Sequence, residues 1–364
     1  MRTSKITCII HKDLSMKISD ALKESGIVCY TVQFGRSVVL REKKRLLGLT
    51  SETVLEDDPV DVYRIYVRPE TAEGLLGLLA EKGDLSTPGR GTVFSEEISV
   101  VKKTDCLMNS IRLKAPREKA QFAEDLTGIC CIVQRGQAVP IIRSLLETGT
   151  VPVVTYGEGT GVRDKLGLLR IAIPAEKEIV NAVVSRYDAE QMMNMLIDIG
   201  RLDQPGKGFI YIFPVNKGLI NAKTQRGRRR HGASMEQIVS AIDNLKGNPE
   251  WRKMETVTKS SGKRKYLRDL ASFNLITNDG KAMEIVKAAM ASGAPGATIS
   301  RGRQVVPEKT GVSSAREMSD LIVGKPQIAA LSKIVEAAGL FTKEASGLIE
   351  TGPVPLACTY LGGK

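Results

Sequence analysis

Hydrophobic and polar residues follow one pattern that occurs three times along this chain. In 6–27, 129–150 and 273–294, a short run of β-branched residues precedes a polar turn and then apolar residues spaced three or four apart. The blocks end at glycines, which are Gly26, Gly149 and Gly293. The first part is typical of a buried strand, and the second of an amphipathic helix that stops at a glycine. Each block therefore predicts a strand, a turn and a helix.

A second block follows each first one at 60–85, 177–202 and 319–340. It again changes from strand-like to helical periodicity, and it ends at Gly83, Gly200 or Gly339. A loop and a last strand come next, at 86–94, 203–211 and 342–350. The chain therefore predicts three βαβ-βαβ repeats of about 90 residues each, with a long link between the second and third strands.

This order favours an α+β fold made of three ferredoxin-like βαββαβ units. Such a unit has four antiparallel strands with two helices on one face. One unit alone would leave its other sheet face uncovered, so we expect the three to pack as an intrachain pseudo-trimer. The predicted boundaries are 1–105 for repeat 1, 106–126 for a spacer, 127–216 for repeat 2, 217–269 for a basic spacer with a short helix, and 270–362 for repeat 3.

The repeats resemble PII signal-transduction proteins, the nitrogen-regulatory family, and their PII-like relatives. The segment from Gly159 to Val184 is especially similar to the PII-like branch. Members of the family are trimers of βαββαβ subunits that bind adenine nucleotides between subunits. Each has a long T-loop after the second strand and a glycine-rich B-loop before the fourth. The resemblance implies three unequal clefts in one chain, and ATP, ADP, AMP or a cyclic nucleotide as the effector, with no other cofactor.

The B-loop positions carry a glycine on either side of a cation in two repeats. These residues are Gly89, Arg90 and Gly91 in repeat 1 and Gly206, Lys207 and Gly208 in repeat 2. Glycine permits positive φ, so successive amides can converge on an anion, but a plain tight turn needs the same glycines. We expect these two loops to bind phosphate. Repeat 3 has Ala345 at the first glycine's position and no cation, so we expect no phosphate there.

The base of the T-loop supplies the other half of the family's site. The matching residues are Gly35 and Arg36 in repeat 1, Gly302, Arg303 and Gln304 in repeat 3, and, in a glycine-rich run of repeat 2, Gly159, Gly161 and Arg163. No repeat carries every part of the motif. Two alternatives follow: one or two composite clefts still bind an anionic ligand, or all three are relics.

Two further segments are candidates for partner contacts. Segment 36–59 of repeat 1 is long and amphipathic, and loops of its length are usually functional or disordered. In the family this loop contacts transporters or enzymes, so we predict a role in partner binding for Arg41, Leu46 and Leu47. The basic spacer adds Arg228, Arg229 and Arg230.

The basic spacer holds much of the chain's charge. Residues 217–269 contain 14 Lys and Arg against 5 Asp and Glu, in a chain of net charge +12. The segment is consistent with a solvated linker, with docking to an acidic partner or membrane headgroups, or with nucleic-acid binding. Its aromatic residues are few, which disfavours base stacking. We favour a linker or a protein-docking segment over nucleic acid.

Composition argues against catalysis and against a metal site. The chain has two histidines and six cysteines, none in a CxxC pair, and the cysteines in β-branched runs are expected to be buried. No catalytic motif occurs, and no apolar run reaches the ~18 residues that span a bilayer. We therefore expect a cytoplasmic, non-catalytic sensor that controls a partner protein. The alternative is a structural scaffold without ligand that self-assembles or joins a larger complex.

Overall fold

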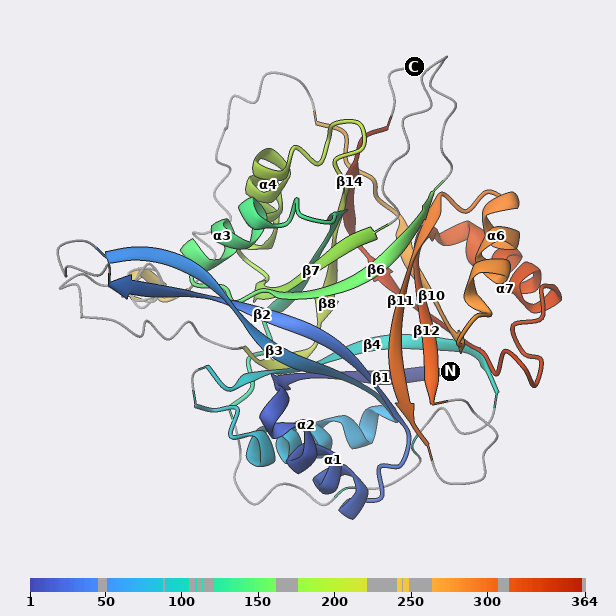
Figure 1. The fold of residues 1–364 in the computed structure, drawn as a ribbon, viewed down its shortest axis with the longest axis horizontal. Coiled ribbons are helices and arrows are strands. Elements are labelled where there is room, and N and C mark those ends of the chain that lie inside the picture. Colours follow the sequence, from blue (N-terminus) through green and yellow to red (C-terminus); the bar gives the residue numbers. More distant parts are fainter. Residues whose placement is uncertain are drawn as a thin grey trace.

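The computed structural model describes residues 1–44, 51–87, 89–104, 109, 113, 121–161, 176–220, 241–243, 245–248, 264–306 and 314–361. The chain is α+β. Its described strands join in one 14-stranded sheet, and the pairings between named strands are antiparallel. The helices lie in pairs outside the strands, which meet in the middle of the molecule (Figure 1).

The three repeats have the same order of elements. Repeat 1 contains β1 (Arg2–His11), α1 (Ser15–Glu24), β2 (Tyr30–Lys44), β3 (Ser51–Val67), α2 (Pro69–Gly83) and β4 (Gly91–Lys103). Repeat 2 contains β5 (Leu126–Gln134), α3 (Val139–Glu147), β6 (Val153–Gly161), β7 (Glu176–Ser185), α4 (Ala189–Gly200) and β8 (Phe209–Val215), followed by β9 (Lys217–Leu219). Repeat 3 contains β10 (Leu270–Asn278), α6 (Ala282–Ala291), β11 (Gly296–Val305), β12 (Ala315–Gly324), α7 (Ile328–Ala337) and β13 (Leu348–Val354), followed by β14 (Leu356–Thr359).

The order of strands within the sheet is also repeated. It runs β4-β1-β3-β2, β8-β5-β7-β6 and β13-β10-β12-β11, with the fourth strand at one edge of each repeat and the second strand at the other. The two edges therefore remain available to pair with neighbouring repeats.

The helices form where the sequence predicts an apolar stripe. In α3, proline at position 140 stands in the first turn, where its missing N–H costs no hydrogen bond, and Ile141 and Leu145 are each 1% exposed or less. Burying one such side chain contributes about 1.5–3 kcal/mol. The helix ends as predicted, and Gly149 has a φ of +91°. After α2 and α4 the left-handed residue is Asp84 or Arg201, one position beyond the expected glycine.

Each repeat has a core of its own, and the core of repeat 2 also receives side chains from the other two. Val38 of β2 is 1% exposed there, and Leu356 and Cys358 of β14 are 4% and 0% exposed. The described cysteines are buried and form no disulfide with one another, and for Cys8, Cys130 and Cys131 this burial was predicted from their β-branched surroundings. The interior of repeat 2 thus links the three repeats.

The chain closes cyclically through its fourth strands. The end of β4 pairs with β13 of repeat 3, β9 pairs with β4 of repeat 1, and β14 pairs with β8 of repeat 2. Equivalent positions meet each time: Val93 with Leu219, Ile210 with Cys358, and Ile349 with Lys102. In each repeat, the chain that continues beyond the fourth strand therefore pairs with the fourth strand of another repeat, and the register is the same in all three cases.

The second strands close a second ring. Arg36 and Ser37, in the middle of β2, pair with the start of β6. The last residues of β6 pair with the start of β11, and the last residues of β11 pair with the start of β2. We call these three junctions the seams. Backbone hydrogen bonds across them satisfy edge groups that an isolated repeat would expose.

Segment 36–59 differs from the predicted loop. β2 and β3 stay paired from Thr31 and Arg64 out to Lys44 and Ser51, which makes a long two-stranded ribbon that projects beyond its own repeat (Figure 1). Leu40 and Leu55 on this ribbon pack against the core of repeat 2. This segment was expected to contact a partner protein, but Leu40 and Leu55 already make an intramolecular contact.

The end of the basic spacer packs on α4. Arg264 forms ion pairs with Asp198 and Asp203, and Tyr266 packs against the core of repeat 2. No helix in the described ranges has both the length and the apolar character needed to cross a membrane.

Candidate functional site

The predicted T-loop bases are distributed over the three seams. Gly35 and Arg36 lie between repeats 1 and 2, the run 157–161 lies between repeats 2 and 3, and Gly302, Arg303 and Gln304 lie between repeats 3 and 1. A glycine permits close backbone approach at every seam. A Cβ at position 35, 157 or 302 would stand 3.0, 2.9 or 3.0 Å from a carbonyl oxygen of the next repeat.

Arg36 connects repeats 1 and 2 through two carboxylates. Its Nη1 donates to both oxygens of Asp57, at 2.7 and 2.8 Å, and its Nη2 donates to Oε1 of Glu178 at 3.0 Å. Burial opposes the charge of Arg36, but the hydrogen bonds to Asp57 and the neighbouring acidic groups raise its pKa above the ordinary value. A phosphate bound here would have to compete with these carboxylates.

Glu178 is a buried residue that the sequence did not single out. It is 4% exposed, and its Oε2 accepts the amides of Gly136 at 2.9 Å and Ala138 at 3.2 Å, just before α3. The equivalent Glu317 of repeat 3 accepts the amide of Ala282 at 2.8 Å, at the start of α6. These acids fix the first helices of repeats 2 and 3 by accepting backbone N–H groups at their starts.

The seam between repeats 3 and 1 is different. Arg303 is exposed, whereas Gln304 is 4% exposed and its Nε2 lies 3.4 Å from Sγ of Cys29. Oε1 of Gln304 is buried, and no residue in the described ranges forms a hydrogen bond with it. The arginine and the glutamine of this triplet therefore face different surroundings and do not form one site.

The two B-loops have the backbone that their glycines predicted. Gly89 and Gly206 have φ values of +86° and +70°. A Cβ on Gly91 would stand 2.2 Å from the carbonyl oxygen of Ile9, and one on Gly208 would stand 2.4 Å from that of Ile132. Packing against the first strand thus requires the last glycine of each loop. Both a tight turn and an anion-binding loop need this conformation, so the positive φ values do not distinguish the two interpretations.

The cations of the B-loops have different surroundings. Nε of Arg90 lies 3.6 Å from Oδ2 of Asp84 in its own loop. The loop of repeat 2 lies beside the end of β5, where Nε2 of Gln134 donates to the carbonyl oxygen of Gly206 at 3.0 Å. The residue after Gln134 is Arg135, which lines the cleft described below.

An arginine that the sequence gave no reason to select lies under the loop of repeat 3. Arg316 is 0% exposed, and its guanidinium donates to the carbonyl oxygen of Ser346 at 2.7 Å and to Oδ1 of Asn278. Burial lowers its pKa to about 10. Ser346 takes a positive φ of +47° in this loop. A buried side chain holds the loop from inside.

An open cleft lies where the three repeats come together, and we call it the seam cleft. It has a volume of about 630 Å³, within the range of small-molecule sites. Three exposed apolar side chains line it: Phe34 of repeat 1 (53% exposed), Tyr156 of repeat 2 (38%) and Met283 of repeat 3 (36%). A cleft with exposed aromatic rings suits a flat apolar ligand group.

Charged side chains surround these rings. Nη1 of Arg135 pairs with Oε2 of Glu176 at 2.9 Å, and Nη1 of Arg301 lies 3.7 Å from Oε1 of Glu158. The side chains of both arginines are more than 60% exposed, at 65% and 69%. Exposed pairs of this kind contribute about 0–1 kcal/mol, so a stronger anion can replace the carboxylates.

The remaining predicted residues are placed only in part. Arg41 lies on β2 with its backbone opposite Val54. Arg163, Leu46, Leu47, Arg228, Arg229 and Arg230 lie outside the described residues. Neither B-loop lines the seam cleft, although Gly157 of the neighbouring glycine-rich run does.

Comparisons with known proteins give little further information. No family model matches this chain, and no curated protein matches it. A solved structure described as aspartate kinase from Synechocystis is similar over 95% of this chain and 43% of its own, with 10% sequence identity and a TM-score of 0.22. A likeness at that level supports no argument about function.

Proposed function

We propose that this chain is a non-catalytic, PII-like regulatory protein that binds an adenine nucleotide or a similar anionic effector between its repeats. In this proposal the repeats are ferredoxin-like units that form a pseudo-trimer within one chain. The repeated element order, the repeated sheet order and the two cyclic sets of strand pairings support it. If three subunits of a trimer were fused into one polypeptide, the same element order, sheet order and cyclic pairings would be expected.

The observation that carries the proposal is the composition of the seam cleft. An adenine ring would stack on Tyr156 and Phe34, and the phosphates would lie against Arg135 and Arg301. From Arg135 the phosphates would extend toward the loop at Gly206, which the neighbouring Gln134 holds through a hydrogen bond of 3.0 Å. The cleft therefore offers groups for both halves of a nucleotide.

The ribbon provides a route from the cleft to a partner. Gln33 and Phe34 line the cleft, and they lie on β2, the strand that continues into the ribbon. A ligand that moved this part of β2 would shift the packing of Leu40 on repeat 2. Effector binding would thus change the surface that the ribbon presents.

Titration calorimetry of the full chain with ATP, ADP, AMP and cyclic AMP tests this function. At least one should bind saturably, and Tyr156→Ala should weaken it about tenfold or more, since stacking contributes ~1–3 kcal/mol per base. Arg301→Gln should weaken the phosphate-bearing ligands. Arg90→Gln is the matched control, because Arg90 lies outside the cleft. Absence of heat with all four nucleotides would contradict the proposal.

A scaffold without ligand is the second candidate, and two observations favour it. Arg36 is already neutralised by Asp57 and Glu178, and Arg316 holds the loop of repeat 3 from within. Light scattering of the purified chain distinguishes the two. Growth in mass with concentration, together with no nucleotide binding, supports the scaffold, and a constant monomer mass excludes self-assembly.

A further inference from the structure

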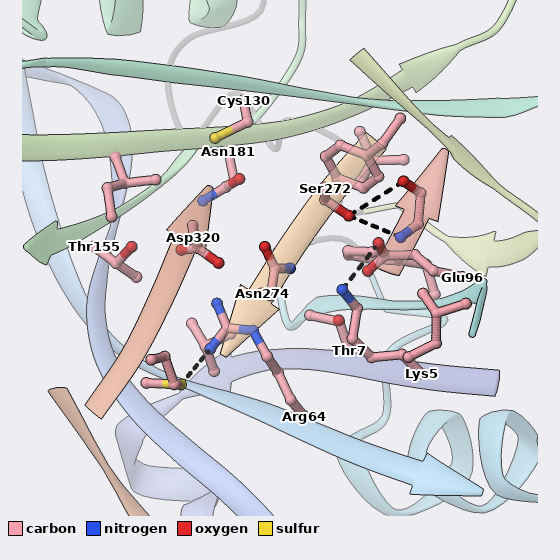
Figure 2. A pocket seen from close by; sticks show the side chains of 18 of the residues that line it. Lys5, Thr7, Arg64, Glu96, Cys130, Thr155, Asn181, Ser272, Asn274 and Asp320 are labelled. Atoms are coloured by element: carbon pink, nitrogen blue, oxygen red, sulfur yellow. Dashed lines mark hydrogen bonds and ion pairs between the residues drawn. The ribbon is translucent and has the colours of Figure 1, made fainter. Parts of the chain in front are cut away.

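A second cavity lies where the sheets of the three repeats face one another, and we call it the central cavity (Figure 2). Its volume is about 130 Å³, well above the ~10–15 Å³ that one water needs. Glu97, whose side chain is 41% exposed, lines one part of it, so it reaches solvent on that side. It shares only a few lining residues with the seam cleft.

Among the residues that line this cavity, each repeat supplies a row of three paired residues at equivalent positions, and repeat 1 adds the charged row of Glu96, Lys5 and Tyr66. In repeat 1 the row is Phe94–Thr7–Arg64, on β4, β1 and β3. In repeat 3 the equivalent strands carry Glu350–Asn274–Asp320. Directly paired residues on one face of a sheet have Cβ atoms about 4.5–5.5 Å apart. The three side chains of each row are therefore close enough to contact one small ligand in the cavity.

The row of repeat 2 is uncharged. It consists of Tyr211, Cys130 and Asn181 on β8, β5 and β7. Equivalent positions thus carry a cation in repeat 1, neutral groups in repeat 2 and two acids in repeat 3. Three identical subunits would place three identical groups here, whereas these rows place a cation in repeat 1 and two acids in repeat 3, with Lys5 and Glu96 of repeat 1 beside them.

The acidic side has acceptor atoms without donors. Glu350 is 4% exposed, and its Oε1 accepts from Nδ2 of Asn274 at 3.0 Å and from Nζ of Lys5 at 3.4 Å. Among the described residues, Oε2 of Glu350 and Oδ1 of Asn274 are buried without a hydrogen-bond partner, although the nearby Tyr66 side chain lowers the pKa of Glu350. Unpaired buried acceptors destabilise a fold, so a donor is expected at this place.

The Asp320 carboxylate also lacks a hydrogen-bond donor among the described residues. Although burial raises the pKa of Glu350, Lys5, Asn274 and Tyr66 lower it overall, and Glu350 is therefore charged beside Asp320. Among the described residues, none donates a hydrogen bond to the Asp320 carboxylate, and no ion pair joins it to Arg64. Figure 2 shows Arg64, Asn274 and Asp320 directed into the same space from three strands.

The basic side keeps donors for a ligand. The recorded hydrogen bonds of Arg64 come from Nη1, which donates to Oε1 of Gln33 at 2.9 Å and approaches Sδ of Met318 at 3.8 Å. A guanidinium has five N–H donors, so it can still take a carboxylate. Lys5 is already held between Glu350 and Glu96, at 3.4 and 3.2 Å.

We propose that the central cavity is a binding site for a small zwitterion, a free amino acid of the size of glycine or alanine. Its carboxylate binds Arg64. Its ammonium donates to Asp320 and to the unpartnered oxygens of Glu350 and Asn274. Lys5 of repeat 1 already pairs with Glu350 of repeat 3, but among the described residues no ion pair joins Arg64 to Asp320. The ligand would connect these two groups, which neither an anion nor a cation alone does. This site is independent of the nucleotide proposed for the seam cleft.

Thermal-shift and calorimetric titrations of the full chain at neutral pH test the proposal. The probes are glycine, L-alanine, acetate, ethylammonium and L-tryptophan. Glycine or alanine should bind saturably and raise Tm, while acetate and ethylammonium should bind at least about tenfold more weakly because each satisfies one side only. Tryptophan should not bind, because the cavity is too small. Equal binding of acetate, or no shift with either amino acid, would overturn the proposal.

Two substitutions assign the groups. Asp320→Asn and Arg64→Gln should each weaken alanine binding about tenfold or more, and Arg301→Gln, in the seam cleft, should leave it unchanged. Unaltered alanine affinity in Asp320→Asn would also overturn the proposal. Asp320→Asn should keep the nucleotide affinity of the wild type, so failure of this site and failure of the nucleotide site give different results. If Arg64→Gln does not fold, the wild-type probe series still decides.

Discussion

The seams and the central cavity are built from equivalent positions of the same repeat, but they use the repetition in opposite ways. At the seams, the same strands meet and a glycine stands at each close approach. In the central cavity, the equivalent positions of β3, β7 and β12 hold Arg64, Asn181 and Asp320. Repetition therefore keeps the contacts that close the ring, while the side chains at the centre differ in charge.

This difference has a physical reason. A seam is a contact between two backbones. At each of the three glycines, a Cβ would lie about 3 Å from a carbonyl oxygen of the next repeat, so a larger residue fits poorly. The centre is a side-chain contact between three faces, and like charges there would repel strongly in a low dielectric. A single chain can give each face a different side chain. The predictions below test whether the seams behave as structure and the centre as a site.

The largest expected effect is at the seam between repeats 1 and 2. Glu178→Ala removes the acceptor of Arg36 and of two amides before α3, and it leaves a partly buried cation with one carboxylate fewer. We expect a loss of about 3–5 kcal/mol in the free energy of unfolding. Urea denaturation measures it. Glu176→Ala, whose side chain is 63% exposed, is the control and should change stability by less than about 0.5 kcal/mol.

The next effect has the opposite sign and lies in the central cavity. Burial raises the pKa of Asp320 to about 6, although Arg64 and Lys5 oppose this. Because the folded-state pKa lies above the ordinary value of 3.8, the Asp320 carboxylate destabilises the fold fully above pH 6, and the effect disappears as the pH falls to about 4. Glu350 and Glu96 also face this group and raise its pKa, and Asp320→Asn leaves them in place.

Asp320→Asn should therefore stabilise the protein by about 1–3 kcal/mol at pH 7.5. The gain should shrink to nothing near pH 4. Denaturation curves of both proteins across that range measure the difference. A variant that is less stable than wild type at pH 7.5 would show that Asp320 forms a stabilising contact in the free protein.

A smaller effect is expected at the seam between repeats 3 and 1. In Gly302→Ala the new Cβ would stand 2.8 Å from the methyl carbon of Met318 and 3.0 Å from the carbonyl oxygen of Val32. The methionine can move, but the backbone of the next repeat cannot, so we expect a loss of about 1–3 kcal/mol. Gly136→Ala serves as a comparison, because it has a φ of +82° and no atom within 4 Å. Gly302 is not among the glycines with positive φ, so Gly136→Ala measures a backbone cost without a steric clash and Gly302→Ala measures the clash.

The smallest effect concerns the ribbon. Leu40 is partly buried against the core of repeat 2, so Leu40→Ala should lower stability by about 1 kcal/mol. It should also increase amide hydrogen exchange in β2 and β3 beyond Arg36 while the rest of repeat 1 stays protected. Val101→Ala, at a side chain 44% exposed, is the control. Unchanged exchange in the ribbon would mean that its contact with repeat 2 contributes little in solution.

The sequence predicts local structure well where one chain segment determines it. The strands and helices lie where the periodicity places them, and Gly26, Gly149, Gly293 and Gly339 take positive φ values at helix ends. The positive φ of Gly89 and Gly206 follows from the same reasoning. The α+β class also follows, because the order of strands and helices limits how their apolar faces can pack.

Contacts between distant segments were not predictable. Arg36 meets Glu178 across 142 positions, and a lone glutamate in a strand gives no sign of that. The extended ribbon was missed because segment 36–59 carries charged and turn-forming residues, which favour a loop over a strand. The rows of the central cavity become visible only when three registers are compared, since the residues share neither charge nor size.

A crystal structure of the full chain grown with ATP tests the central proposal most directly. The account predicts the adenine against Tyr156 and the phosphates between Arg135 and Arg301, in the direction of Gly206. ATP bound elsewhere with the seam cleft empty, or no ATP at a concentration that saturates calorimetric binding, would contradict it.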